Sequence, residues 1–391
     1  MSYIPLKPSN ALSASTDYLQ QKLNQASEKK LNYYTGSGQS LHVGETDVSN
    51  VRINSETLDG VKLFNGVPAI APGFTQVLTE ADVASVIPFV QTSRETHIYS
   101  MISRLRSKVG GTWLVANHAR GAKKIEELTV GTDPYNNGLT MLAAANAAAT
   151  SLGLDGCVAP FTTFLHGEAN IADDLSRNGY QYEMNAYEAS IGKALFTHFG
   201  GNVVPMFTTQ IGSSGSINFA GNELDISNVH PSVFCAGPNW PLERMYNSTS
   251  SDYTHLNATG YTILGEMLAA SIEQVVYREN VGYKPLQPKS VKVSGNTVAI
   301  EFHVPKGSLV VDTTTFVEAP LLGIGIYHSS GYSRSVGRWA VSGNTVTLSV
   351  DMLGLPIVAG AYLLGGNTLT DRGSTNGVNV PLINLRGSVV A

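Results

Sequence analysis

Residues 30–45 read KLNYYTGSGQSLHVGE, in which an apolar run is followed at once by glycines, a serine and a histidine. The run KLNYYT predicts a buried β-strand, and the glycines predict a tight turn after it. A serine at the junction of a strand and a helix can act as a nucleophile, although the same letters also describe an ordinary flexible turn. The choice between these interpretations depends on whether the rest of the chain supplies a base.

The composition of the 391-residue chain limits the classes of function. Only 14% of the residues are charged, whereas about 25% is usual. Such a surface suits neutral polar ligands such as sugars. The net charge of −5, without basic clusters, argues against a nucleic-acid partner. Cys157 and Cys235 are too few for a disulfide framework, and of a single bridge or two buried thiols we favour the thiols.

Secondary structure alternates along the middle of the chain. Strands are predicted at 30–35, 112–117, 156–166, 203–211 and 232–237, and helices at 95–108, 136–153, 182–201 and 257–276. This alternation predicts a doubly wound α/β domain over residues 31–280, with helices on both faces of a parallel sheet. Ligands of such domains bind beyond the carboxyl ends of the strands.

The pattern changes at both ends of the chain. After a linker at 280–290, the tetrad SGNT occurs twice within alternating apolar and polar residues, which predicts two hairpins. Residues 281–391 are therefore expected to form a small antiparallel β-sandwich. Residues 1–30 are expected to form a separate arm with a thinly apolar helix, which needs the body of the protein or another chain as its partner. A homo-oligomer is one such arrangement.

Neither a secretion signal nor a membrane span is expected from the sequence. The N-terminus lacks the basic start and continuous apolar core of a signal peptide. No run of apolar residues is long enough to cross a bilayer. A protein of this kind that works outside a cell would leave it by assembly or by lysis.

A base for the serine stands near the end of the α/β region. The segment SDYTHLNATGY (251–261) places Asp252 three residues before His255, directly before the last predicted helix of that domain. At this spacing, the carboxylate can hold the Nδ1–H of the imidazole and leave Nε2 free to take a proton from a serine. Ser40 follows the first strand and this pair follows the last, so both fall at the same edge of a parallel sheet.

Two further segments fall at the same edge and offer hydrogen-bond donors for an oxyanion. Gly121, in ANHARG after the second strand, either presents its N–H to a substrate oxygen or simply starts a helix. FLHGEAN (164–170), after the third strand, contains His166, Glu168 and Asn170. The N–H groups of Ser40 and Gly121, with a side chain from this segment, are the expected oxyanion hole.

Three short motifs follow one another within residues 31–280: Gly38–Gln39–Ser40, His166–Gly167–Glu168 and Asp252-Tyr-Thr-His255. In this order they resemble the SGNH (GDSL-like) hydrolase superfamily, in its sialate O-acetylesterase-like and carbohydrate acetylesterase branch. The resemblance implies a flavodoxin-like three-layer α/β/α domain without cofactor. It further implies that Ser40, His255 and Asp252 form the triad and that Gly121 contributes to the oxyanion hole.

The Asp-Tyr-Thr-His-Leu motif and the β-rich C-terminal region also resemble polysaccharide deacetylases carried on bacteriophage tails. This likeness implies an acetylated polysaccharide or oligosaccharide as substrate. It also implies a place in the virion, with the N-terminal arm as the attachment.

The sequence departs from the family pattern at two positions. Leu41 stands where the family often has asparagine, and His166 stands where it has glutamine. The oxyanion role of that glutamine passes either to His166, which its register favours, or to Asn170. Gln39, His42 and Glu168 are expected at the substrate pocket, where His42 either lines the pocket or packs against it and Glu168 buttresses the site.

Other chemistries lack part of their residue sets. His166-Gly-Glu matches the H-x-E of zinc deaminases, but no P-C-x-x-C follows. His42 and Glu45 give two metal ligands without a third, and hydrolysis by two carboxylates needs a partner for Glu168. A non-catalytic carbohydrate-binding or tail-structural protein is the alternative from another class, against which the complete serine, histidine and aspartate set argues. The residues thus predict a serine hydrolase, and the resemblance implies that it removes O-acetyl groups from a carbohydrate.

Overall fold

A computed structural model gives the fold of the chain. The residues that it describes are 29–44, 57–67, 76–90, 95–171, 177–201, 203–211, 222–239, 241–242, 252, 254–305, 307–311, 325–328, 331–333, 337–350, 363–364, 369–371 and 380–381. The arm predicted at residues 1–30 lies almost wholly outside these ranges, as do most residues after 311.

The central element is a mixed sheet in which β1 (Leu31–Gly38) is buried along its whole length. β1 pairs in parallel with β4 on one side and with β6 on the other. In spatial order the sheet runs β3 (Val86–Val90), β2 (Thr57–Phe64), β4 (Trp113–Asn117), β1, β6 (Thr162–Leu165), β7 (Met206–Gln210) and β8 (Val233–Pro238). The five strands from β4 to β8 follow the flavodoxin-like order, which confirms the predicted fold class.

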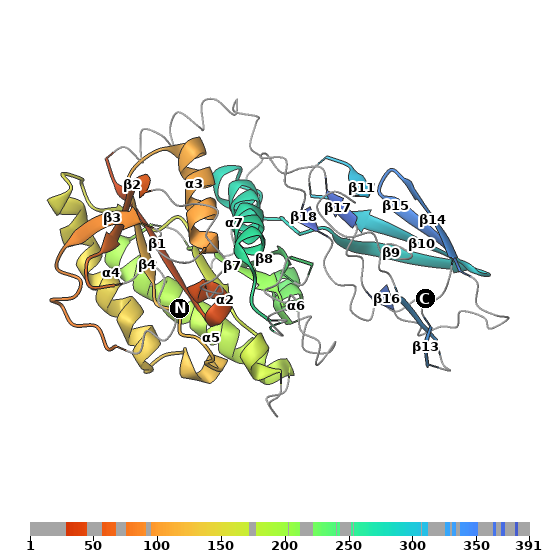
Figure 1. Cartoon of the computed structure of the whole chain (residues 1–391), viewed down its shortest axis with the longest axis horizontal. Coiled ribbons are helices and arrows are strands. Elements are labelled where there is room, and N and C mark those ends of the chain that lie inside the picture. The colour runs from red at the N-terminus through yellow and green to blue at the C-terminus, as the bar shows by residue number, and fades with distance from the viewer. Residues whose placement is uncertain are drawn as a thin grey trace.

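Helices cover both faces of this sheet, as Figure 1 shows. α3 and α7 share one apolar cluster with Tyr34 of β1, and α4 and α5 share another with Tyr33. Successive residues of a strand point to opposite faces, so one strand serves both layers. The long helices are α3 (His97–Val109), α4 (Asp133–Ser151), α5 (Arg177–Phe199) and α7 (Ala258–Ile272).

The ends of the helices follow ordinary capping chemistry. The Thr96 hydroxyl accepts from the Ile98 N–H at the start of α3, and Asn257 Oδ1 accepts from the Gly260 N–H at the start of α7. α7 continues into a π-helical turn over Glu273–Tyr277. The shorter helical elements are α2 (Ser40–Val43), α6 (Asn222–Val229) and the 3₁₀ turns η1 (Ile125–Glu127) and η2 (Glu168–Asn170).

Two features differ from the sequence-based expectation. The sheet is not wholly parallel, because β3 pairs antiparallel with β2 at its edge. The strand predicted at 156–166 is divided into β5 (Cys157–Val158) and β6 at Pro160, where the sequence predicts an interruption. Proline has no N–H to donate to a neighbouring strand, which explains the interruption. The strands β2 and β3 and the helix α6 were not predicted, because their apolar patterns are short.

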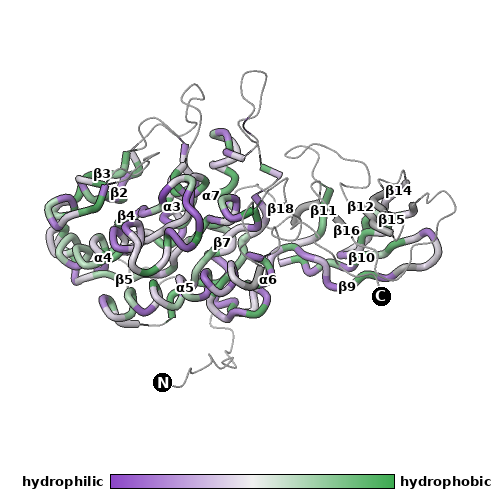
Figure 2. Tube along the Cα trace, turned by 90° about the horizontal axis from the view of Figure 1, so that it is seen from below, coloured by the Kyte–Doolittle hydropathy of each residue, from purple (hydrophilic) through white to green (hydrophobic). Residues whose placement is uncertain are grey.

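The chain after α7 forms antiparallel sheets, as predicted. The first has the order β14-β15-β10-β9, and each SGNT tetrad makes a hairpin turn with its glycine at positive φ. Along β10, buried Val298, Ile300 and Phe302 alternate with more exposed residues. Figure 2 shows hydrophobic and hydrophilic stretches along the trace around β9 and β10. The strands are β9 (Gln287–Ser294), β10 (Thr297–His303), β14 (Gly337–Ser342) and β15 (Thr345–Val350).

Two smaller three-stranded antiparallel sheets complete the described part of the tail. One has the order β11-β17-β18 and the other β13-β12-β16. Their strands are β11 (Leu309–Val311), β17 (Leu369–Asp371), β18 (Val380–Pro381), β13 (Gly331–Ser333), β12 (Gly325–His328) and β16 (Leu363–Leu364). The domain boundary predicted after residue 280 falls between the π-helical turn and β9.

Two expectations from composition concern cysteines and membranes. Cys157 and Cys235 are both buried free thiols. Among the residues that the structure describes, none of the helices combines the length and the apolarity needed to cross a membrane.

Candidate active site

Ser40 is the first residue of α2, directly beyond the carboxyl end of β1. Gly38 has a φ of 138° and lies so close to the Leu165 carbonyl that any side chain there would collide with it. The Gln39 N–H donates to the same carbonyl (3.1 Å). These contacts turn the chain sharply and leave Ser40 at the edge of the sheet with 6% of its surface exposed.

The structure brings Ser40, His255 and Asp252 together in one line of hydrogen bonds. Ser40 Oγ lies 2.7 Å from His255 Nε2, and His255 Nδ1 lies 2.6 Å from Asp252 Oδ2. The carboxylate requires the proton on Nδ1, so Nε2 accepts from the serine hydroxyl. The side chains of His255 and Asp252 are 22% and 28% exposed, so the line is open to a substrate from solvent.

The other oxygen of Asp252 fixes the loop before α7. Asp252 Oδ1 accepts from the N–H groups of Thr254 (2.8 Å) and His255 (3.0 Å). Burial raises the pKa of Asp252, but hydrogen bonds from His255 and Thr254 outweigh it and bring this pKa below its ordinary value. The carboxylate therefore stays charged near neutral pH and can support an imidazolium.

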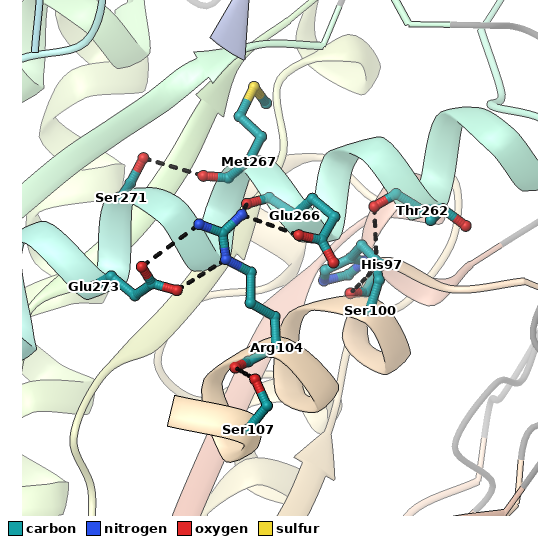
Figure 3. Close-up of polar contacts among 9 residues, drawn as sticks. All are labelled: His97, Ser100, Arg104, Ser107, Thr262, Glu266, Met267, Ser271 and Glu273. Atoms are coloured by element: carbon teal, nitrogen blue, oxygen red, sulfur yellow. Dashed lines mark hydrogen bonds and ion pairs between the residues drawn. The ribbon is translucent and has the colours of Figure 1, made fainter. Parts of the chain in front are cut away.

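The helix that follows His255 is anchored by a buried ion-pair network (Figure 3). Arg104 of α3 donates through Nε to Glu273 (2.8 Å) and through Nη1 to Glu266 (2.9 Å), the latter in α7. Gly265 brings the two helices close, because a side chain there would collide with Ser100. Since α7 begins three residues after His255, this packing holds the imidazole against the sheet edge.

Gly121 lies in the turn between β4 and η1, at the same edge of the sheet. The N–H of Arg120 donates to the Gly38 carbonyl (2.9 Å), and the N–H of His118 donates to the Gly36 carbonyl (3.0 Å). The loop that carries Gly121 is therefore hydrogen-bonded to the residues just before Ser40. Gly121 does not start a long helix, since only the three-residue turn η1 follows before α4.

His166 and Asn170 do not point their donors at Ser40 but brace the Gly121 loop. His166 Nε2 donates to the Lys123 carbonyl (2.9 Å), and its Nδ1 accepts from the Tyr180 hydroxyl (3.1 Å). Burial lowers the pKa of His166 to about 4, so the neutral ring has no second N–H to offer. Asn170 Oδ1 accepts from the Ile125 N–H (2.9 Å), and its Nδ2 donates to Glu126 Oε2 (3.2 Å). We therefore revise the expected oxyanion role of both side chains.

Gln39 and Glu168 form a bridge between loops. Gln39 Nε2 donates to Glu168 Oε2 (2.7 Å), and Gln39 Oε1 accepts from the Ala169 N–H (3.0 Å). Glu168 Oε1 also accepts from Asn239 Nδ2 (3.2 Å), so the loops after β1, β6 and β8 are joined. Glu168 thus links three loops at the edge of the sheet where Ser40 lies. Sequence reasoning missed Asn239, although its place directly after the last strand was a usable signal.

His42 is fully buried beneath Ser40 and does not line a pocket. Its ring contacts Asn117 at the end of β4, Thr163 of β6 and Tyr34 of β1. Of the two placements expected for His42, the structure shows the packed one, because the α2 turn directs residue 42 towards the sheet while residue 40 faces outward. Sequence reasoning did not find Asn117 and Thr163, which read as ordinary strand residues.

Among the described residues, no group of three or more histidine, cysteine, aspartate or glutamate side chains is arranged to hold a metal ion. His42 keeps protein partners on both ring nitrogens. The chemistry that this arrangement supports is acyl transfer to a serine hydroxyl, which needs only groups of the chain itself.

A solved structure shares this architecture over most of its length. The structural alignment with a carbohydrate acetylesterase from Xanthomonas citri covers 92% of this chain and 79% of that chain. The TM-score is 0.57 at 14% sequence identity. The two chains therefore share one overall fold. At this identity the likeness establishes the fold, and the reaction has to be argued from the site.

Two further solved structures are less similar. NanS has a TM-score of 0.48 at 12% identity, over 65% of this chain and 99% of its own. A protein from Arabidopsis thaliana has a TM-score of 0.47 at 15% identity, over 64% of this chain and 99% of its own. No protein-family model matches the sequence, and no curated protein matches it.

Proposed function

We propose that this protein is a serine esterase that removes O-acetyl groups from a carbohydrate. The observation that carries the proposal is the continuous line of hydrogen bonds from Asp252 through His255 to Ser40. The fold supports it, because an acetylesterase acting on carbohydrate has the same architecture. The low content of charged residues is consistent with a neutral polar substrate.

In the proposed reaction, His255 takes the hydroxyl proton of Ser40 as the oxygen attacks the acetyl carbonyl. The tetrahedral intermediate collapses when His255 gives this proton to the departing sugar oxygen, and the acetyl group remains on Ser40. Water then attacks the acetyl-enzyme with His255 again as the base; the bond between the acetyl carbon and Ser40 Oγ breaks, His255 returns the proton to this oxygen, and acetate leaves. Asp252 holds the imidazole in the required tautomer and stabilises its positive charge in both steps.

The proposed oxyanion donors are the backbone N–H groups of Ser40 and Gly121. The N–H groups at the start of α2 precede the first helical hydrogen bond, in which His42 N–H donates to the Gln39 carbonyl. The Gly121 loop is tied to the same turn through Gly38. A donor aimed at the developing negative charge contributes about 3–4 kcal/mol to the stabilisation of the transition state.

The resemblance carries two further proposals. The substrate is a bacterial surface polysaccharide, and the protein is attached to a phage tail through residues 1–30. Oligomerisation through the same arm is a further proposal, since residues 1–28 lie outside the described part of the chain.

Release of acetate from an acetylated bacterial polysaccharide, followed by proton NMR, tests the proposal. The wild type should release acetate, and Ser40→Ala should abolish nearly all release while its circular dichroism stays unchanged. Ser190→Ala is the matched control, because its hydroxyl donates within α5, to the Tyr187 carbonyl (2.9 Å).

Equal release by the wild type and Ser40→Ala would remove Ser40 as the nucleophile. New reducing ends without acetate would instead indicate glycoside hydrolysis. Binding of the polysaccharide with no product at all would favour the non-catalytic alternative.

A further inference from the structure

His42 occupies the space directly under the proposed nucleophile and touches three strands. It lies two residues after Ser40 in α2 and is fully buried. Its Nδ1 is 3.1 Å from Asn117 Oδ1, and its Nε2 is 2.8 Å from Thr163 Oγ1 and 3.3 Å from the Tyr34 hydroxyl. A histidine with protein partners on both ring nitrogens has a defined orientation.

The direction of each hydrogen bond in this group follows from one backbone contact. Asn117 Oδ1 accepts from the Ala119 N–H (3.1 Å), so the amide oxygen faces His42 and Nδ1 must carry the ring proton. Nε2 is then an acceptor, and the Thr163 hydroxyl donates to it. The Tyr34 hydroxyl, 2.6 Å from Thr163 Oγ1, donates in turn to Thr163.

This series of hydrogen bonds requires a neutral His42 ring, and the surroundings of the ring keep it neutral. Burial is the largest cause that lowers the pKa of His42 well below its ordinary value, and the nearby His97 lowers it further. The His97 ring packs edge-on against it, with the ring centroids 4.7 Å apart. A protonated His42 would lose the acceptor that Thr163 needs.

Gly36 leaves the room for this ring. A Cβ at residue 36 would collide with His42 Nε2 and with the Tyr34 hydroxyl. The first glycine of the GSGQSLH segment is thus explained by the histidine six residues later, and the segment acts as one packing unit.

We infer that His42 is a positioning residue that fixes Ser40 relative to the loop carrying Gly121. One oxygen, Asn117 Oδ1, holds both the His42 ring and the Ala119 N–H at the start of that loop. Thr163 holds the opposite side of the ring. The position of Ser40 relative to this loop decides how the serine hydroxyl is aligned with the two oxyanion N–H groups. The inference therefore rests on the proposed function.

The variant that tests the inference is Thr163→Val, which keeps the shape of residue 163 and removes its donor to Nε2. We expect kcat for p-nitrophenyl acetate to fall about tenfold, the effect of one lost hydrogen bond. KM should stay within twofold and the melting temperature within a few degrees. Thr163→Ser keeps the hydroxyl and should restore most of the rate.

A matched control is Thr208→Val on β7. Thr208 is equally buried, and its hydroxyl has no hydrogen-bond partner among the described residues. This substitution should leave kcat unchanged. A Thr163→Val enzyme with kcat within twofold of wild type, or one that loses rate only in proportion to its loss of folded protein, would overturn the inference.

A second measurement does not depend on activity. Long-range ¹H–¹⁵N spectra of histidine-labelled protein should show His42 as the neutral Nδ1–H tautomer, with its signals assigned through His42→Gln. The Nε2–H tautomer would overturn the inference even in an active enzyme. A wild type that neither hydrolyses the ester nor reacts with a fluorophosphonate would instead overturn the proposed function.

Discussion

Replacing His97 with leucine tests how burial of imidazoles sets the acid stability of the fold. His97 is fully buried, and neither of its ring nitrogens has a hydrogen-bond partner in the described part of the chain. Burial lowers the pKa of His97 to about 3. In the unfolded chain this pKa returns to about 6.5, so the unfolded state binds a proton that the folded state refuses.

The sign and size of the effect follow from this difference in pKa. Because the folded pKa is the lower one, His97 favours unfolding progressively as the pH falls from about 6.5 towards 3. Each pH unit below the unfolded pKa is worth about 1.4 kcal/mol per proton. Between pH 7.5 and pH 5.0, His97 should therefore remove about 2 kcal/mol from the free energy of unfolding, and His97→Leu should not.

Urea unfolding followed by circular dichroism at 222 nm measures this change. Every α-helix among the described residues lies before residue 273, so this signal follows the α/β part of the chain. Packing changes caused by leucine are the same at both pH values and cancel in the comparison. His198→Gln, at an exposed position of α5, should keep the pH dependence of the wild type. Identical pH dependence in wild type and His97→Leu would refute the reasoning.

Three further substitutions probe the site and its support. Gly36→Ala should destabilise the fold by about 1–3 kcal/mol in urea unfolding, because the new methyl group overlaps the His42 ring; unchanged stability would show that this ring can move aside. Arg104→Met leaves the buried Glu273 without its cation and should cost about 3–5 kcal/mol. The double variant Arg104→Met with Glu273→Met should recover most of the lost free energy of unfolding. No recovery would mean that the loss comes from packing and not from the unpaired charge. Asp252→Asn should lower kcat for ester hydrolysis by about 10⁴-fold at unchanged KM, because the imidazole loses the partner that fixes its tautomer; a rate near wild type would make the carboxylate dispensable.

The sequence predicted the α/β architecture because its strands and helices have clear periods. The strand at 30–35 and the helices at 95–108 and 257–276 all occur in the structure. The strand β2 and the edge strand β3 escaped prediction because they are partly exposed and lack a regular apolar pattern. Such short elements gain their stability from neighbours that are distant in the chain, and periodicity does not report distant neighbours.

In the proposed site, too, the sequence predicted local contacts and missed several of those that depend on distant parts of the chain. Asp252 and His255 could be paired from their spacing alone, since three residues suffice for a local contact. Their meeting with Ser40 followed from parallel-strand topology, because both segments come at carboxyl ends of strands. The placement of His42 stayed open between lining the pocket and packing against it, since nothing in the local sequence tells which side of a single helical turn faces the sheet.

By itself, the sequence determined which residue types are present and in what order they reach the edge of the sheet. It determined the aspartate–histidine pair and the hairpins of the tail, which depend on contacts within a few residues, whereas the serine turn also needs the Leu165 carbonyl of a neighbouring strand. Only the tertiary structure decided that His166 and Asn170 brace a loop and that His42 lies beneath the nucleophile. A side chain's hydrogen-bond partners depend on groups brought together by the sheet, and a linear pattern does not contain those distances.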